Sequence, residues 1–403
     1  MHINIVKRVK KGIFKDFILN IIASGIYTLA TQILAYPYLS RIMSGNEYGL
    51  VLTLMGINNA VGVSLGNPLN NTRILLQPSY DKKNLKGDYN LIFLFCLIID
   101  IIVTASVTSI ILKKFNIIAL GCTIVSSLIL FRAYYSASYR IVINYKKNLY
   151  SSISGLFGYI FGMWITYLTN SWIFTFVFGE LFACIYIFYT AKIVHDGFQI
   201  TPMLKRTLKK YLLIMSAAIL STMMTYMDRF FIYPFLGADQ VSVYNVASFL
   251  GKTAGIIMIP VSGVLLTYYA KDSKLTIIEF YKRMGLFFGV SLLFYIGIIL
   301  VGIPVTGFLY PTIIGGATPY FGIANLATTI FILGNTIQPT LLRFCSSIWQ
   351  PIIQGIYFLI YLLLGIYGMQ QEGLMGFCYA VLIANIIKIV IMIVIATITL
   401  YNN

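Results

Sequence analysis

LIFLFCLIIDIIVTASVTSIIL, residues 91–112, is a run of 22 residues that contains one charged side chain, Asp100. A helix needs about 20 mainly apolar residues to cross the hydrocarbon core of a bilayer. The stretch therefore has the length and the composition of a membrane-spanning helix. Because a charge at the centre of a bilayer is costly, Asp100 is expected to face the interior of a helix bundle.

The composition of the whole chain agrees with this stretch. Of its 403 residues, 59% are hydrophobic and only 10% are charged. A soluble domain has about 25% charged residues, so this chain has too few polar side chains to cover a water-soluble core. The sequence therefore predicts a membrane protein that crosses the bilayer many times.

The same length criterion predicts twelve spans. They cover residues 17–43, 48–76, 90–112, 117–142, 151–169, 171–191, 211–236, 241–270, 284–310, 319–343, 351–369 and 373–400. With the N-terminus in the cytoplasm, 22 of the 29 Lys and Arg residues fall on the cytoplasmic side. Because cytoplasmic loops collect basic residues, both termini are predicted to be cytoplasmic. This orientation also accounts for the formal net charge of +17, and no nucleic-acid partner is expected.

The chain divides into two predicted halves. The longest cytoplasmic link, residues 192–210, lies at its midpoint, between six-helix bundles at 1–191 and 211–403. AYPYLSRIMSGNEYGL (35–50) and FIYPFLGADQVSVYNV (231–246) both read Tyr-Pro, aromatic, Leu, followed by a turn with Gly and an acid. Since both halves enter from the cytoplasm, they would be parallel repeats about a pseudo-two-fold axis along the membrane normal. The expected fold class is all-α, with twelve transmembrane helices.

Several ionisable residues lie inside the predicted spans. They are Asp100, Arg132, Glu180, Asp228, Arg229, Lys252 and Lys388. Such residues almost always face a bundle interior or a water-filled cavity. One interpretation is mutual neutralisation, and the other is a cationic cavity for an anionic substrate. Arg41 and Arg73, at the ends of the first two spans, favour the second.

Under the cationic interpretation, the predicted anion contacts are Arg41, Arg73, Arg132, Arg229, Lys252 and Lys388, and the predicted counter-ions or coupling groups are Asp100, Glu180 and Asp228. Asp228 and Arg229 are adjacent, so on a helix their side chains point about 100° apart and are poorly placed to neutralise each other. We expect Arg229 to contact the anion, with Asp228 as its positioning partner or a counter-ion.

The second span, residues 49–73, carries five Asn residues. Unpaired amides are costly in hydrocarbon, so this helix should not face lipid. Either it packs closely against its neighbours through small residues and amides, or it lines a cavity. In the second case Asn58, Asn59 and Asn67 would offer donors and acceptors that suit sugar hydroxyls.

The Cys and His residues and the basic stretches narrow the range of functions that the sequence suggests. The five Cys residues are scattered in apolar segments and the two His residues have no ligand partners nearby, so neither a metal site nor a cofactor is expected. Basic amphipathic stretches at 5–17, 203–212 and 273–284 suit the surface of anionic lipids. They would anchor the topology or gather lipid-linked anions.

Three segments resemble those of a known family. LSRIMSGNEYGL, GVSLGNPLNNTR and MDRFFIYPFLGADQVSVYNVAS are similar to motifs of the bacterial polysaccharide flippases for O-antigen or capsule, which belong to the multidrug/oligosaccharidyl-lipid/polysaccharide exporter superfamily. The matching residues include Arg41, Gly45, Glu47 and Arg73. Ser242 departs from the pattern, because the family often has Gly there.

The resemblance implies a flippase, not an enzyme. Its substrate would be an undecaprenyl-diphosphate-linked oligosaccharide, moved from the cytoplasmic to the outer leaflet of the bacterial inner membrane by alternating access. A polysaccharide polymerase and a chain-length regulator would be its partners. Two alternatives are open: a multidrug and toxin extrusion exporter, which moves mainly cationic drugs, and a polytopic polysaccharide-modifying or polymerising enzyme. The excess of basic over acidic residues in the spans disfavours the first, and the short outside loops disfavour the second.

Overall fold

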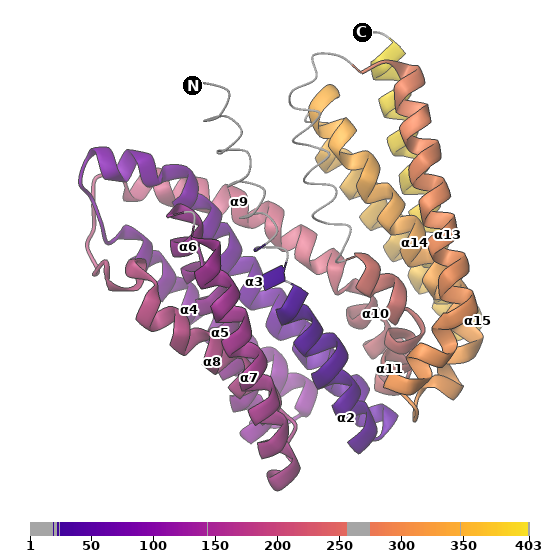
Figure 1. The fold of residues 1–403 in the computed structure, drawn as a ribbon, viewed down its shortest axis with the longest axis horizontal. Helices are drawn as coiled ribbons and strands as arrows, with labels where there is room; N and C mark the ends of the chain where they lie inside the picture. Colours follow the sequence, from indigo (N-terminus) through magenta and orange to yellow (C-terminus); the bar gives the residue numbers. More distant parts are fainter. Residues whose placement is uncertain are drawn as a thin grey trace, which may run out of the picture. The chain divides into compact units, whose positions relative to one another are not determined.

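A computed structural model describes residues 25–142, 144–255, 275–346 and 348–401, together with residues 19 and 22–23 (Figure 1). The predicted amphipathic stretch 5–17 and much of the predicted span 241–270 lie outside the described residues. Throughout the described ranges, the regular secondary structure is helical.

The helices follow one another with short links. They are η1 (a π-helix, Ala30–Ala35), α2 (Tyr36–Ile42), α3 (Gly45–Lys82), α4 (Asp88–Leu112), α5 (Ile117–Tyr135), α6 (Ala137–Ile141), α7 (Tyr145–Thr169), α8 (Ile173–Thr190), η2 (a 3-10 helix, Lys192–His195), α9 (Leu204–Thr225), α10 (Met227–Leu236), α11 (Ala238–Ala247), α13 (Ile277–Leu309), α14 (Ile314–Phe344) and α15 (Trp349–Tyr401). Residues 25–29 and 249–255 are also helical.

Many of these helices are membrane spans by length and composition. Seven helical stretches among the described residues are long and apolar enough to cross a bilayer, and α9 with α10, bent by 52°, makes an eighth. In the most apolar stretch of 18 residues in α13, only 11% of the residues are buried within the protein. Its bulky apolar side chains are therefore left for lipid, as expected of a polytopic membrane protein.

Two predicted helix breaks lie where the sequence places them. Between α7 and α8, Asn170 has a φ of +54°, in the left-handed region that ends a helix. Within α15, Glu372 and Gly373 are non-helical, and Gly373 has a φ of +58°. The chain reverses there, so that Gly368 and Gly376 pack backbone to backbone: a Cβ at residue 376 would lie 2.0 Å from the carbonyl oxygen of Gly368. The 53 residues of α15 therefore contain two helices, as predicted.

Close packing of small residues joins α7 to α8, which lie side by side (Figure 1). A Cβ at Gly158 would lie 2.3 Å from the carbonyl oxygen of Phe178, and one at Gly162 would lie 2.6 Å from that of Phe174. Small residues let two helix backbones approach closely, which is the main way that helices associate in lipid.

The chain forms two compact units. The first contains residues 1–39 and 53–227, and the second contains residues 40–52 and 228–403. This grouping differs from the predicted halves in two places, because residues 40–52 join the second unit and residues 211–227 join the first. The predicted bundles at 1–191 and 211–403, with a linker at 192–210, stay a prediction, as does the pseudo-two-fold axis.

Candidate functional site

Two ion pairs form between residues of the predicted spans, one in each unit. Arg132 of α5 pairs with Glu180 of α8 in the first unit, at 2.7 Å between Nε and Oε2. Lys252 pairs with Asp228 of α10 in the second unit. Part of the predicted mutual neutralisation is therefore present, and these two pairs are the strongest candidates for the functional site.

Glu180 lies at the centre of a polar cluster in the first unit. Its carboxylate accepts hydrogen bonds from both Nε and Nη2 of Arg132, and from the Tyr27 hydroxyl. The Tyr159 hydroxyl is 3.4 Å from the same carboxylate and 3.2 Å from the Tyr27 hydroxyl. The Arg132 guanidinium stacks over the Tyr27 ring at 4.0 Å from the centroid. Three segments far apart in the chain thus meet at one carboxylate.

Asp228 holds the corresponding cluster in the second unit. One carboxylate oxygen accepts from Lys252 Nζ, and the other accepts from the backbone N–H of Arg229 at 2.9 Å. Lys252 Nζ also lies 4.8 Å from the centroid of the Tyr244 ring. An aromatic face adds to the stabilisation of an ammonium group, by about 0.5–2 kcal/mol depending on its exposure.

The two ion pairs share an arrangement. In each, the acid is buried and the base is partly exposed: the side chains of Glu180 and Asp228 are 3% and 9% exposed, whereas those of Arg132 and Lys252 are 26% and 34% exposed. In both pairs, most of the exposed side-chain area therefore belongs to the basic residue.

Arg229 is a buried residue of the second unit. Its side chain lies in the buried part of the second unit, where Nη1 donates to the carbonyl oxygen of Leu52 at 3.0 Å and Nη2 donates to Asn245 Oδ1 at 3.3 Å. Asp228 and Arg229 are linked by a hydrogen bond from the backbone N–H of Arg229 to the Asp228 carboxylate. In this conformation Arg229 joins α10 to α3 and α11.

Lys388 of α15 is 4% exposed. Its Nζ lies 4.6 Å from the ring centroids of both Phe331 and Tyr357, and no carboxylate among the described residues is within ion-pair distance of it. The Tyr357 hydroxyl donates to Asn385 at 2.8 Å, which orients that ring. Two aromatic faces thus hold a buried ammonium group in the second unit.

Arg41 and Arg73, the predicted residues at span ends, have local partners. Arg41 is exposed, and its Nη2 donates to the carbonyl oxygen of Phe308 at 2.6 Å. Arg73 is buried and forms an ion pair with Asp196, while its Nη1 donates to the Tyr134 hydroxyl at 2.9 Å.

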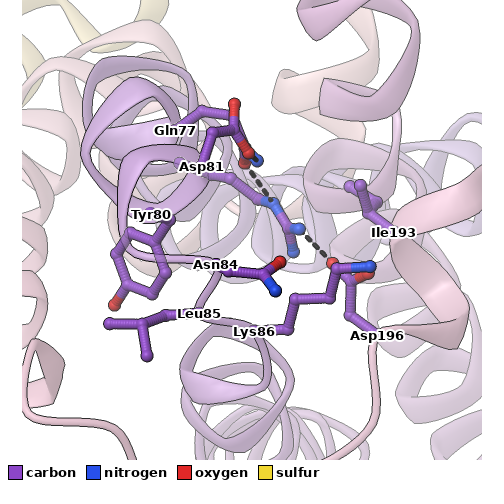
Figure 2. Close-up of a pocket in the computed structure, with 9 residues that line it drawn as sticks. Gln77, Tyr80, Asp81, Asn84, Leu85, Lys86, Ile193 and Asp196 are labelled. Carbon is purple, nitrogen blue, oxygen red and sulfur yellow. Dashed lines mark hydrogen bonds and ion pairs between the residues drawn. The ribbon is translucent and has the colours of Figure 1, made fainter.

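Arg73 lines a cavity of about 220 Å³ in the first unit. Figure 2 shows Gln77, Tyr80, Asn84, Lys86 and Asp196 around this cavity. The charged residues of its wall are Arg73, Asp81, Lys86 and Asp196, so their formal charges cancel. Ligand pockets usually measure about 300–1,000 Å³, so this cavity is small for an oligosaccharide and is not cationic.

The three predicted asparagines are unlike one another. Asn58 is fully buried, Asn59 donates to the carbonyl oxygen of Met55 in its own helix at 2.8 Å, and Asn67 is exposed. Asp100 is also fully buried, and its carboxylate accepts hydrogen bonds from the Ser126 and Ser127 hydroxyls of α5. In the part of the chain that the structure describes, no cluster of three His, Cys, Asp or Glu side chains is arranged to hold a metal ion.

The sequence interpretation missed several partners. Tyr27, Tyr159, Tyr244, Asn245 and Asp196 each contact a predicted site residue, but none was singled out. Tyr is abundant in this chain, with 30 residues, so no single Tyr stands out. Tyr244 and Asn245 do lie in the segment 231–246 that resembles 35–50, and that resemblance is the one signal that pointed to them.

The fold is similar to solved transporter structures. The lipid II flippase MurJ in an inward closed conformation matches with a TM-score of 0.69 and 16% identity, over 95% of this chain and 86% of that chain. An inward-facing multidrug resistance MATE family transporter of the MOP superfamily matches with a TM-score of 0.68 and 13% identity, over 96% and 95% of the two chains. A MATE crystal structure in the bent conformation matches at 0.65 and 13%, over 98% and 96%.

The sequence itself matches no protein-family model and no curated protein. At sequence identities of 13–16%, the similarity to these structures shows a shared fold only. It confirms the predicted class, an all-α polytopic membrane protein with the twelve-helix transporter fold.

Proposed function

We propose that this protein is a flippase for undecaprenyl-diphosphate-linked oligosaccharide repeat units. It moves them from the cytoplasmic to the outer leaflet of the bacterial inner membrane by alternating access, for the synthesis of O-antigen, capsule or exopolysaccharide. The observation that carries the proposal is the arrangement of the two ion pairs: in both, the base is the exposed partner.

Arg and Lys side chains are the residues that bind a diphosphate. Arg presents a planar fork of donors that suits phosphate oxygens, and Lys adds a point charge. In the proposed mechanism Arg132 and Lys252 are cations that the diphosphate contacts, while the acyl chain stays in lipid. Arg41, Arg73, Arg229 and Lys388 would contact the anion in other conformations of the cycle, and Asn59 and Asn67 would bind sugar hydroxyls.

The exposed start of α9 supports the approach of an anionic lipid. Lys205, Arg206 and Lys209 are exposed there, within the predicted cytoplasmic link. Each Lys or Arg near an anionic membrane surface contributes about 1 kcal/mol of attraction. We propose that this segment gathers anionic lipids, that both termini are cytoplasmic, and that the polymerase and the chain-length regulator act on the flipped product.

The experiment is a flipping assay in proteoliposomes with a defined lipid-diphosphate oligosaccharide. Arg132→Gln with Glu180→Gln, and Lys252→Met with Asp228→Asn, remove each pair as a unit, so that no charge is left buried alone. We expect both double variants to insert and fold, and to lose flipping. Lys113→Gln is the matched control, since Lys113 is exposed outside the predicted spans.

Flipping at the wild-type rate in both double variants would disprove the cationic contact. Loss of flipping in the control as well would show that the assay responds to any change of surface charge.

A second candidate function is a multidrug exporter of the MATE type. It is favoured by the structural likeness, because MATE structures match with TM-scores of 0.65 and 0.68, close to the 0.69 of the flippase. Efflux of a cationic dye from the same proteoliposomes distinguishes the two. Dye efflux without flipping of the lipid-linked oligosaccharide would favour this candidate and reject the flippase.

A further inference from the structure

The cavity beside Arg73 is enclosed by two distant parts of the chain. The end of α3 contributes Arg73, Gln77 and Asp81 to its wall, and the loop between α3 and α4 contributes Lys86. Asp196, just after η2, comes from the link that follows α8. The cavity therefore exists only where this link lies against the end of α3, on the predicted cytoplasmic side.

A chain of polar contacts runs along this wall. Asp196 forms an ion pair with Arg73, whose Nε donates to Gln77 Oε1 at 3.3 Å. Gln77 Nε2 in turn donates to Asp81 Oδ1 at 2.8 Å. Each group is oriented by its neighbour, so little conformational freedom is lost when a ligand binds to them.

The loop between α3 and α4 is also held in place. The backbone N–H of Asn84, which has a φ of +51°, donates to the carbonyl oxygen of Asp81 at 3.1 Å. A Cβ at Gly87 would lie 2.5 Å from the backbone nitrogen of Gln199, so the loop packs directly against the link. The Asn84 amide and the Lys86 ammonium group are thus presented to the cavity from a fixed backbone (Figure 2).

Two of the four charged groups in the wall already have a partner. Arg73 and Asp196 neutralise each other, and their side chains are 5% and 12% exposed. Asp81 and Lys86 are exposed, and neither takes part in an ion pair among the described residues. A simple anion would be repelled by Asp81 and a simple cation by Lys86, whereas a ligand with both charges would be attracted by both residues.

We propose that this cavity binds a small zwitterion, whose acidic group contacts Lys86 and Arg73 and whose primary ammonium group contacts Asp81. Its volume of about 220 Å³ is below the roughly 300–1,000 Å³ of pockets for drug-sized ligands, so the ligand is small. The amides of Gln77 and Asn84 offer further donors and acceptors. Two sources share this chemistry: the phosphoethanolamine headgroup of a phospholipid in the cytoplasmic leaflet, and a zwitterion dissolved in the cytosol.

This site is separate from the Arg132–Glu180 and Lys252–Asp228 ion pairs of the candidate functional site. Its occupancy can be measured without a lipid-linked oligosaccharide. Failure of the flipping assay therefore leaves the zwitterion site standing, and failure of zwitterion binding leaves the flippase proposal standing.

The first test is equilibrium binding of radioactive glycerophosphoethanolamine, the soluble headgroup of phosphatidylethanolamine, to the purified full-length protein in detergent. We expect saturable binding of one molecule per chain. Glycerophosphocholine carries the same charges but has no N–H donor for Asp81, and glycerol phosphate carries the acidic group alone, so both should compete much more weakly. Equal competition by glycerol phosphate would overturn the assignment of a zwitterion.

Native mass spectrometry of the protein, released from nanodiscs with equal amounts of phosphatidylethanolamine, phosphatidylglycerol and phosphatidylcholine, distinguishes the two sources. Retention of one phosphatidylethanolamine per chain, lost in Lys86→Gln, assigns the site to the lipid headgroup. Binding of the soluble headgroup without such retention assigns it to a cytosolic zwitterion. Neither lipid retention nor soluble binding would overturn the proposal.

Asp81→Asn and Lys86→Gln each remove one charge from the cavity wall and leave Arg73 unchanged. Each should lower the affinity for the zwitterion by about threefold to tenfold, because one partly exposed hydrogen bond between charged groups is lost. Lys82→Gln is the matched control, since Lys82 is exposed at the same end of α3 but does not line the cavity.

Thermal unfolding in detergent without the ligand should be the same in all three variants and in the wild type, because the three side chains are exposed. Wild-type affinity in both Asp81→Asn and Lys86→Gln would overturn the proposal. So would an equal loss of affinity in Lys82→Gln, since the binding would then depend on surface charge and not on the cavity.

Discussion

Gly49 of α3 lies against the backbone of Ala238 at the start of α11, so closely that a Cβ at residue 49 would stand 1.6 Å from the carbonyl oxygen of Ala238. A Cβ at Gly45 would similarly meet the Asp239 side chain, at 2.3 Å. These residues belong to the segments 35–50 and 231–246, which resemble each other in sequence. The two related turns therefore pack on one another within the second unit.

This contact predicts the effect of a side chain at residue 49. Gly49→Ala should force the two turns apart and lower the free energy of unfolding, by about 1–3 kcal/mol if the backbone yields as in other overpacked sites. Thermal unfolding in detergent measures this change. Gly289→Ala in α13 is the control: nothing lies within 4 Å of its Cβ position, so it should be neutral or slightly stabilising.

The effects of substituting Lys252 and Asp228 on the stability of the protein should depend strongly on each other. Lys252→Met alone leaves the Asp228 carboxylate buried without its partner, which costs about 3–5 kcal/mol for a fully buried pair and less here because Lys252 is partly exposed. Adding Asp228→Asn should restore most of the lost stability. A double-mutant cycle on thermal unfolding tests this, and additive effects of the two substitutions would contradict it.

Lys388→Met should reduce transport without reducing the thermal stability of the protein. The substitution keeps the length of the side chain and removes an ammonium group that is desolvated and held by two aromatic rings. We expect unchanged or higher thermal stability, because burying a charge is costly, together with reduced flipping in proteoliposomes. Normal flipping in a stable Lys388→Met protein would exclude a direct role for this residue.

Asp88 at the start of α4 should have a purely structural role. Its Oδ1 accepts from the backbone N–H of Thr201 at 2.7 Å, and its Oδ2 accepts from the Tyr80 hydroxyl at 2.6 Å and from the Thr201 hydroxyl. This buried carboxylate joins the end of α3 and the start of α4 to the segment before α9. Asp88→Ala should destabilise the protein by about 1.5–3 kcal/mol for each hydrogen bond lost to the charged group.

Thermal unfolding again measures the loss, and Asp81→Ala, at the exposed end of α3, is its control. The fraction of Asp88→Ala that remains folded should flip substrate at the wild-type rate. A specific loss of transport in that fraction would contradict the structural role.

The helices were predictable because their cause is local. A run of about 20 apolar residues crosses a bilayer wherever it lies in the chain, so 91–112 and the break at Glu372–Gly373 could be located from the sequence. The partners of the charged residues were not predictable in this way. Glu180 bonds to Tyr27 and Arg132, which lie 153 and 48 residues away, and nothing near Glu180 in the sequence indicates either one.

Asp228 and Arg229 illustrate what the sequence can predict and what only the tertiary structure decides. Their adjacency alone indicated that the two side chains diverge, and they do: Asp228 bonds to Lys252, and Arg229 bonds to Leu52 and Asn245. The sequence by itself determined the membrane-spanning class and the positions of the buried charges, because hydrophobicity acts over one helix. Only the tertiary structure decided which charge meets which partner and which side of each pair is accessible, because these depend on helix faces brought together from distant parts of the chain.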